Sequence, residues 1–389
     1  MFRGVRDQLK NPRARRRLCK GLSVLAVTSA PWVWYYTSDS KQILLLQWNT
    51  MLKSSYMFEG TGLSQRAAAA RESFSGQVSS VTPDRAVLEL REIMNVEGLS
   101  SPDWAHEELA SLGGVGVWRV TNAVASPQDK DDEVAIMYAH GGRFVAGSAM
   151  RYMYLLSTWT YPLNASIGVI DYPLAPEVSP EHIVEAFTQA CRSILDEQGG
   201  ERLILAGDGT GAAIIFSALM KLKDEGRDLP AAVVLTSPSA DLLAEGSFEQ
   251  DRLTSNQTWR AVRSLTGSEE SLRRVSPLRQ EGLEKFSGMP ETLILYGTRD
   301  LSVDQAKQLK DRLLNADVRV ETIERKYLWP NWLFCYYTFP EGWADMQIVR
   351  DFIDGATSRT PQDVSLPQHP FLKWIRGVWT RNDPQAETS

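Results

Sequence analysis

The sequence predicts an α/β protein in which helices cover both faces of a mainly parallel sheet. Three observations indicate this class: short apolar runs alternate with segments of helical periodicity, the runs are almost continuously apolar, and one run turns through glycines into a helix. A strand that is buried on both faces is apolar throughout, because neither face meets water. At 389 residues the chain is long enough to bury one large core.

The expected elements follow one another from residue 115 to residue 353. Strands are expected at 115–120, 133–139, 166–172, from 202 into the glycine turn, and at 231–236, 292–296 and 318–323. Helices are expected at 179–197, 212–223, 303–314 and 343–353. The helix at 179–197 opens with Ser179-Pro180-Glu181, a typical helix start. Regular alternation of this kind favours parallel strands joined by crossover helices.

Composition divides the chain into four parts. They are a basic N-terminus with a membrane anchor at 1–40, N-terminal cap helices and first strands at 41–130, a catalytic-type core at 131–358 with a cap insertion at 240–288, and a tail at 359–389. The cap helices are expected at 42–58 and 65–75. The tail has an amphipathic segment at 371–379, which we expect to pack on the body of the protein.

The N-terminus differs from the rest of the chain in charge. Its first twenty residues contain eight arginines and lysines and one acid, and an uncharged run at 21–37 ends in tryptophans and tyrosines. Seventeen residues are near the lower limit for a spanning helix, and the aromatic group is typical of a membrane interface. We expect a retained signal-anchor that makes the protein single-pass in the endoplasmic reticulum or another endomembrane. A mitochondrial presequence or inner-membrane anchor is the alternative.

Charge and cysteine content exclude several function classes. A formal net charge of −6 gives no reason to expect a nucleic-acid partner. Three cysteines are too few and too scattered for a disulfide framework or a metal site. No motif for a metal, nucleotide or organic cofactor is present, so we expect none.

A glycine-rich turn at 207–211 is the centre of the predicted site. In a G-x-S-x-G elbow, flanking glycines let a strand and a helix crowd together and the middle residue is lifted above the sheet edge. Here Gly207 and Gly211 are the flanking residues, and Gly209 is in the middle, where a nucleophile would stand. Taken alone, the segment is also consistent with an ordinary glycine-rich turn.

Four other segments accompany the turn in a definite order. They are His140-Gly141-Gly142, the stretch DYPLAPE at 171–177, LTSPSAD at 235–241 and YGTRD at 296–300. Together with the turn, they resemble the motifs of the hormone-sensitive-lipase-like carboxylesterases, which have the α/β-hydrolase fold. The resemblance extends from residue 133 to residue 353. It implies an α/β-hydrolase core with a helical cap.

The resemblance also implies site roles by position. Asp300 matches the acid of the catalytic triad, Gly209 stands at the nucleophile position, and Asn331 or Trp332 stands where the family has its histidine. The oxyanion hole is expected to use backbone amides of Gly141, Gly142 and Thr210. Two of the three catalytic groups are therefore absent together.

Other residues near these positions are candidates for a ligand pocket or a rescued reaction. The pocket candidates are His140, Arg143, Asp208, Trp329 and Trp332, with Arg143 where a further glycine is usual in the family. The Thr210 hydroxyl, the Asp208 carboxylate and His369 of the tail are conceivable replacements for the missing groups. We expect His140 to organise the turn rather than to react.

Two hypotheses of function remain open. In the first, the chain is a membrane-anchored esterase-like protein that has lost hydrolysis and acts as a binding protein, a receptor or a subunit of an assembly. Its partners would be a small apolar ligand or ester, the membrane and other proteins. In the second, it is an active carboxylesterase or deacetylase, or a non-hydrolytic enzyme that uses the retained oxyanion hole.

Overall fold

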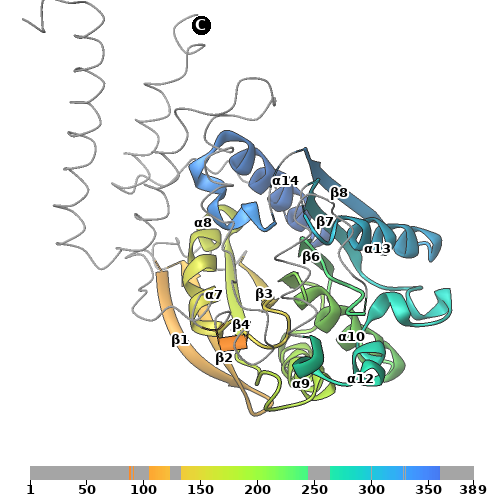
Figure 1. Cartoon of the computed structure of the whole chain (residues 1–389). Helices are drawn as coiled ribbons and strands as arrows, with labels where there is room; N and C mark the ends of the chain where they lie inside the picture. The colour runs from red at the N-terminus through yellow and green to blue at the C-terminus, as the bar shows by residue number, and fades with distance from the viewer. Residues whose placement is uncertain are drawn as a thin grey trace, which may run out of the picture.

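The computed structural model describes residues 87–88, 91, 105–122, 133–243, 263–298, 300–326, 328 and 330–359. Its centre is an eight-stranded sheet with the order β1-β2-β4-β3-β5-β6-β7-β8 (Figure 1). The strands are β1 (Ala105–Leu112), β2 (Val115–Asn122), β3 (Val134–Ala139), β4 (Ala165–Ile170), β5 (Leu203–Asp208), β6 (Ala232–Thr236), β7 (Glu291–Gly297) and β8 (Val320–Arg325). The pairs β1–β2 and β2–β4 are antiparallel, and all other neighbouring strands are parallel. The mainly parallel sheet is confirmed.

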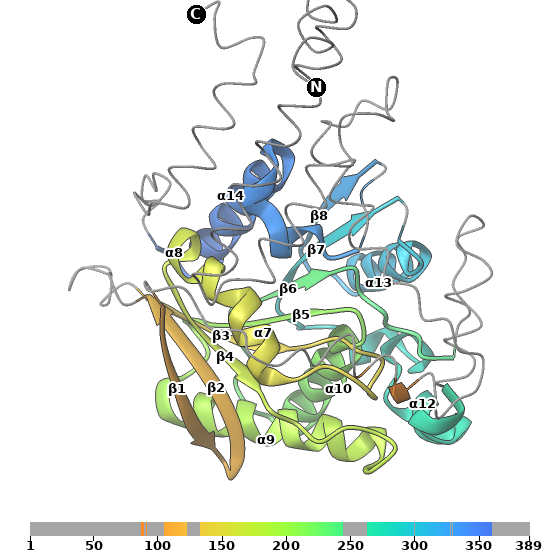
Figure 2. The ribbon, with the colours of Figure 1, turned by 60° about the vertical axis from the view of Figure 1, so that its left-hand side comes forward.

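Helices cover both faces of this sheet (Figure 2). One face packs against α9 (Pro180–Gln198), α10 (Gly211–Asp224) and α13 (Val303–Asn315). The other packs against α7 (Ala149–Leu156), α8 (Thr160–Leu163), η5 (Trp332–Thr338) and α14 (Pro340–Ala356). The shorter elements are η1 (Ser157–Trp159), α12 (Glu269–Arg274), η3 (Pro277–Arg279) and η4 (Leu283–Lys285).

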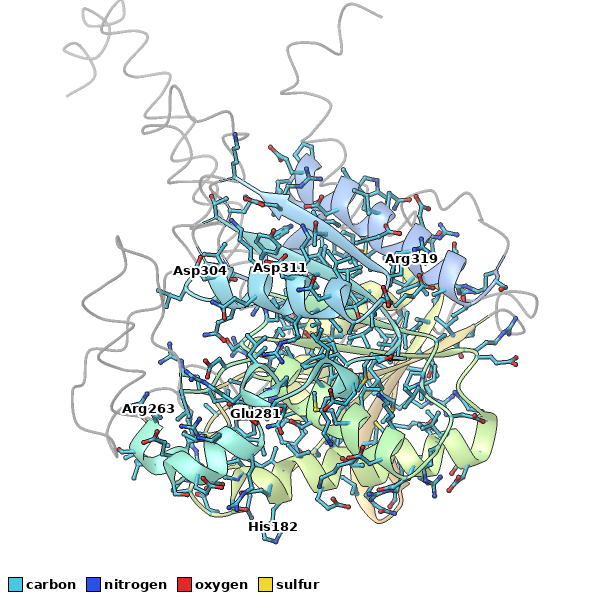
Figure 3. The ribbon with its side chains drawn as sticks, turned by 90° about the vertical axis from the view of Figure 1, so that its right-hand side faces the viewer. His182, Arg263, Glu281, Asp304, Asp311 and Arg319 are labelled. Atoms are coloured by element: carbon cyan, nitrogen blue, oxygen red, sulfur yellow. The ribbon has the colours of Figure 1, made fainter. Side chains whose placement is uncertain are left out.

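Alternate residues of the central strands pack into two separate hydrophobic cores, one on each face of the sheet. Successive residues of a strand point to opposite faces. On β5, Leu203 and Leu205 join the core beneath α9 and α10, whereas Ile204 and Ala206 join the core beneath α14. The surface helix α13 shows the complementary pattern, because it buries Leu309 and leaves Asp304 and Asp311 exposed (Figure 3).

The structure adds elements that the sequence pattern does not predict. β1 is an edge strand whose residues are all exposed or half-buried, so it lacks the apolar run that marks the inner strands. α7 begins at Ser148, whose side chain accepts a hydrogen bond from the Arg151 amide. The described part of the insertion at 240–288 contains α12 and short 3₁₀ turns, in keeping with an insertion that lacks strands.

Several predicted features lie outside the described residues. They are the basic N-terminus, the run at 21–37, the cap helices at 42–58 and 65–75, Trp329, and the tail beyond residue 359 with His369. None of the helices in the described ranges combines the length and hydropathy that crossing a bilayer requires.

Candidate functional site

The glycine turn joins the end of β5 to the start of α10 and approaches the end of β3 closely. A Cβ atom at Gly211 would lie 2.0 Å from the Ala139 carbonyl oxygen, and one at Gly207 would lie 2.7 Å from it. Packing therefore requires both flanking glycines. At Gly209 the nearest atom to a Cβ would be the Cα of Gly141, at 3.9 Å, so a side chain has room there. The φ of Gly209 is +49°, the strained conformation that a nucleophile elbow imposes.

Two backbone amides beside Gly209 have no acceptor in the described part of the chain. They belong to Gly142 and Thr210. Gly142 and Gly209 are themselves partly exposed, so this edge of the turn is open to solvent. The Thr210 amide lies at the start of α10, and a backbone N–H in that position suits a carbonyl oxygen or an anion.

The expected contribution of Gly141 to an oxyanion hole needs correction. Its amide donates to Oδ1 of Asp208 at 2.8 Å, so this N–H is already used inside the protein. The amide of Arg143 is used as well, because it donates to Oγ1 of Thr210 at 3.1 Å. The Thr210 hydroxyl is therefore held by the loop that follows β3.

Asp208 is buried beneath the turn and is surrounded by donors. Its Oδ1 accepts from the Gly141 amide and the Tyr138 hydroxyl, and its Oδ2 accepts from the Tyr152 hydroxyl at 3.1 Å and from Nδ2 of Asn331 at 2.9 Å. Burial raises the pKa of Asp208 to about 6, and these hydrogen bonds limit the rise. Because it is buried, Asp208 lies beneath the turn and not at its exposed edge.

Asn331, which the sequence analysis assigns to the position of the family's histidine, lies at the start of η5. Its Nδ2 donates to Asp208, and its Oδ1 accepts from the Thr236 hydroxyl at 3.1 Å. Its backbone amide donates to Oγ of Ser237, also at 3.1 Å. The side chain is thus held toward Asp208, and the described residues place no hydrogen bond between Asn331 and Asp300.

Asp300, the predicted triad acid, is buried just after β7. Its Oδ1 accepts from the amide and the hydroxyl of Ser302, at 2.9 and 2.8 Å. Its Oδ2 is buried and has no hydrogen-bond partner among the described residues. Burial raises the pKa of this carboxyl. Among the described residues, no imidazole is hydrogen-bonded to this carboxylate, as one would be in a triad.

Trp332 does not line the site, contrary to the expectation from the sequence. It is 1% exposed, and its Nε1 donates to Oδ2 of Asp345 at 2.9 Å. Arg325 donates from Nε to the other oxygen of Asp345 at 2.8 Å. Phe334 stacks on Trp159 in the same core, so the aromatic residues of this segment fill the interior.

His140 directly follows β3 and packs inside the protein. It is 1% exposed and stacks between Tyr152 and Tyr172, with ring centroids 5.1 and 4.3 Å away. Burial lowers its pKa to about 4, so the ring is neutral near pH 7. Arg143, the next pocket candidate, is partly exposed, and burial lowers its pKa to about 10.

The sequence does not indicate the hydrogen bonds that hold Asp208. Tyr152 belongs to α7, which was not predicted, and the bond from Asn331 to Asp208 depends on a backbone φ of +57° at Asn331. No cluster of three His, Cys, Asp or Glu side chains suited to a metal occurs within the described ranges.

Comparison with known proteins identifies the same fold. A family model described as the alpha/beta hydrolase fold matches residues 136–332. An acetyl-hydrolase of Streptomyces hygroscopicus is 30% identical over 273 residues, which cover 66% of this chain and 88% of that protein. An esterase of Acinetobacter venetianus is 27% identical over 237 residues, covering 57% of this chain and 74% of the esterase.

The chain is also similar to a mammalian lipase and to esterases of known structure. Human hormone-sensitive lipase is 32% identical over 142 residues, or 35% of this chain and 13% of the lipase. The crystal structure of EstE5 soaked in ethyl alcohol superposes with a TM-score of 0.63 at 22% identity, covering 75% of this chain and 97% of that one. An esterase from the bacterial hormone-sensitive lipase family gives 0.60 at 21% identity, covering 82% and 98%.

Proposed function

Because this chain belongs to the hormone-sensitive-lipase-like α/β hydrolases, we propose that it binds a carboxylic ester, or the acid of one, without hydrolysing it by a serine–histidine relay. The carbonyl oxygen is held by the amides of Gly142 and Thr210.

One observation carries the proposal: the two positions that would supply a nucleophile and a base hold Gly209 and Asn331. Ester hydrolysis by this route needs a hydroxyl and an imidazole that takes its proton. Gly209 has no side-chain oxygen, and an asparagine amide does not accept a proton near neutral pH. The Asn331 amide is also occupied, because it donates to Asp208.

The test measures binding and turnover on the same protein. The full-length protein is incubated with p-nitrophenyl esters of two to eight carbons, and its Tm and the release of p-nitrophenol are recorded. We expect the Tm to rise with ester concentration and release to stay at the buffer rate. No rise in Tm for any chain length would contradict the proposed binding.

A matched pair of variants at Thr210 tests which group holds the carbonyl. Thr210→Pro and Thr210→Val both lose the hydroxyl, but only proline removes the amide N–H, and the φ of −70° at this residue suits proline. We expect ester binding to be lost in the proline variant and kept in the valine variant. Circular dichroism confirms that both variants are folded.

Active ester hydrolysis is the second candidate, and the relatives favour it. These relatives include an acetyl-hydrolase and an esterase. Hydrolysis would use the buried Asp300 carboxyl and the Gly142 and Thr210 amides, which have no acceptor among the described residues. Labelling by a serine-directed fluorophosphonate, lost in Thr210→Ala, would support this candidate. Release of p-nitrophenol above background that disappears in Asp300→Asn would do the same.

We further propose that residues 21–37 attach the protein to an endomembrane, as the basic and aromatic flanks of this run indicate. The full-length protein should stay in the membrane pellet after alkaline carbonate extraction, and a form lacking residues 1–40 should not. Cofractionation with mitochondrial markers would favour the alternative location. Release of the full-length protein by carbonate would refute the anchor.

A further inference from the structure

Arg91 connects a segment before the sheet to the loop that follows β3. Its Nε donates to the Val145 carbonyl at 2.7 Å, and its Nη2 donates to the Ala175 carbonyl at 2.9 Å. Nη1 and Nη2 also donate to the two carboxylate oxygens of Glu177, at 2.8 and 2.7 Å. One guanidinium thus joins residues that lie 54, 84 and 86 positions away in the chain.

The position of Arg91 is itself fixed by packing. Val87, one helical turn earlier, is also helical, is 5% exposed and belongs to the core beneath α9 and α10. The Arg91 side chain is 26% exposed, and the two carbonyls that it binds belong to fully buried residues. The guanidinium therefore lies at the edge of the core and not in open solvent.

The loop that Arg91 binds contains a strained turn at residues 142–146. The Gly142 carbonyl accepts hydrogen bonds from the amides of Val145 and Ala146, at 3.1 and 3.0 Å. Within the turn, Arg143 and Phe144 have φ values of +58° and +66°, a left-handed conformation that is unfavourable for residues other than glycine. Such a turn persists only where its surroundings hold it.

Arg91 and Ala175 hold this turn from outside. The Ala175 amide donates to the Phe144 carbonyl at 2.8 Å, and Arg91 donates to the next carbonyl, that of Val145. Because Arg91 also binds the Ala175 carbonyl, these contacts form one connected network. Loss of the guanidinium would remove two of its three hydrogen bonds.

The carbonyl bonds of Arg91 matter more for the turn than its ion pair does. The Glu177 side chain is 59% exposed, and exposed ion pairs contribute little to stability because water solvates both partners. Val145 and Ala175 are buried, so without the guanidinium their carbonyls are acceptors that water reaches poorly. Glu177 therefore orients the guanidinium, and the two carbonyl bonds fix the turn.

We propose that Arg91 is a positioning residue that fixes the turn at 142–146 and, through it, the Gly142 amide beside Gly209. The Gly142 carbonyl closes the turn, so a change in the turn also changes the direction of the N–H on the same residue. The inference rests on the function proposed above, in which this amide holds the ester carbonyl. A segment before the sheet thereby sets the geometry of the ligand site.

Hydrogen exchange of the full-length protein without ligand tests the hold on the turn. Arg91→Met keeps a long side chain but has no donor, so we expect protection of the Val145 and Ala146 amides to fall roughly tenfold. Protection of α13, which contains none of these residues, should not change. Unchanged protection of the turn would overturn the proposal. An equal fall in the turn and in α13 would also overturn it, because the whole protein would then be destabilised.

Two further variants separate the carbonyl bonds from the ion pair. Glu177→Gln removes the partner's charge and leaves both carbonyl bonds, so protection of the turn should stay within about twofold of wild type. Arg91→Lys keeps the charge but has one nitrogen in place of three, so it should lose most of the protection. This variant gives an independent reading if Arg91→Met does not fold. Wild-type protection in Arg91→Lys, or a fall in Glu177→Gln as large as in Arg91→Met, would assign the effect to charge and contradict the proposal.

Calorimetric titration with p-nitrophenyl butyrate connects the turn to ligand binding. We expect the Kd of Arg91→Met to be roughly tenfold above that of the wild type, and the Kd of Glu177→Gln to stay within about twofold. Equal Kd values for the wild type and a folded Arg91→Met protein would contradict the link from Arg91 to the Gly142 amide. If the wild type binds no ester, the proposed function fails, whereas the exchange measurement still decides whether Arg91 holds the turn.

Discussion

Replacing Asp208 with asparagine should remove a large pH dependence of stability. The carboxyl is buried, and its pKa is raised from 3.8 to about 6 in the folded protein. The folded state thus binds this proton more tightly than the unfolded state does. The resulting stabilisation is fully present below pH 3.8 and is lost as the pH rises through 6.

The size of the effect follows from the two pKa values. A shift of about two units corresponds to about 3 kcal/mol of unfolding free energy over the whole titration. Between pH 4.5 and pH 8 the change is about 2 kcal/mol, because the unfolded-state carboxyl is already mostly ionised at pH 4.5. Asparagine at position 208 has no such proton to lose.

Urea unfolding followed by tryptophan fluorescence measures this difference. The wild-type and Asp208→Asn proteins are compared at pH 4.5, 6 and 8, so that titrations common to both cancel. We expect the wild-type unfolding free energy, relative to the variant, to fall by about 2 kcal/mol from pH 4.5 to pH 8. A difference that is constant, or that grows with pH, would refute the reasoning about Asp208.

Three further substitutions test the packing around the site, each by urea unfolding. Gly209→Ser should fold, because a Cβ there meets no atom closer than 3.9 Å, but the φ of +49° should lower the unfolding free energy by about 1–2 kcal/mol. Wild-type stability of this variant would show that the turn is unstrained. Arg325→Met should lower the unfolding free energy by about 3 kcal/mol, because it removes the arginine that pairs with the buried Asp345 carboxylate. A loss under about 1 kcal/mol would contradict this role of Arg325. Gly142→Ala should lower the unfolding free energy by at least about 3 kcal/mol or prevent folding. The added Cβ would lie 2.0 Å from the Ala146 carbonyl oxygen, and the φ at this residue is +116°. Near-wild-type stability would mean that the loop adapts.

The inner sheet could be predicted from sequence because its strands are buried on both faces. β5 and β6 have no exposed residue, so each reads as an apolar run with sharp limits. β1 was missed because an edge strand with one solvated side carries no such run. Its sequence, AHEELASL, resembles a helix or a loop as much as a strand.

Motif order in the sequence proposes positions for the site, but it does not predict their hydrogen bonds. Motif order identified Gly209, Asp300 and Asn331, because each follows a strand that ends at the same sheet edge. The direction of the Asn331 side chain depends on its left-handed backbone and on its hydrogen bonds with Asp208 and Thr236. Likewise, no pattern indicates that Asp208 uses the Gly141 amide, which depends on side-chain geometry alone.

The most direct test of the account compares ester hydrolysis by the wild type and by a Gly209→Ser/Asn331→His double variant. The account predicts that the wild type releases p-nitrophenol from p-nitrophenyl acetate at the buffer rate. The double variant, which regains a nucleophile and a base beside Asp300, should exceed that rate, and adding Asp300→Asn should reduce it again. Wild-type turnover that the double variant does not surpass, and that Asp300→Asn abolishes, would contradict the claim that this chain lacks a working relay.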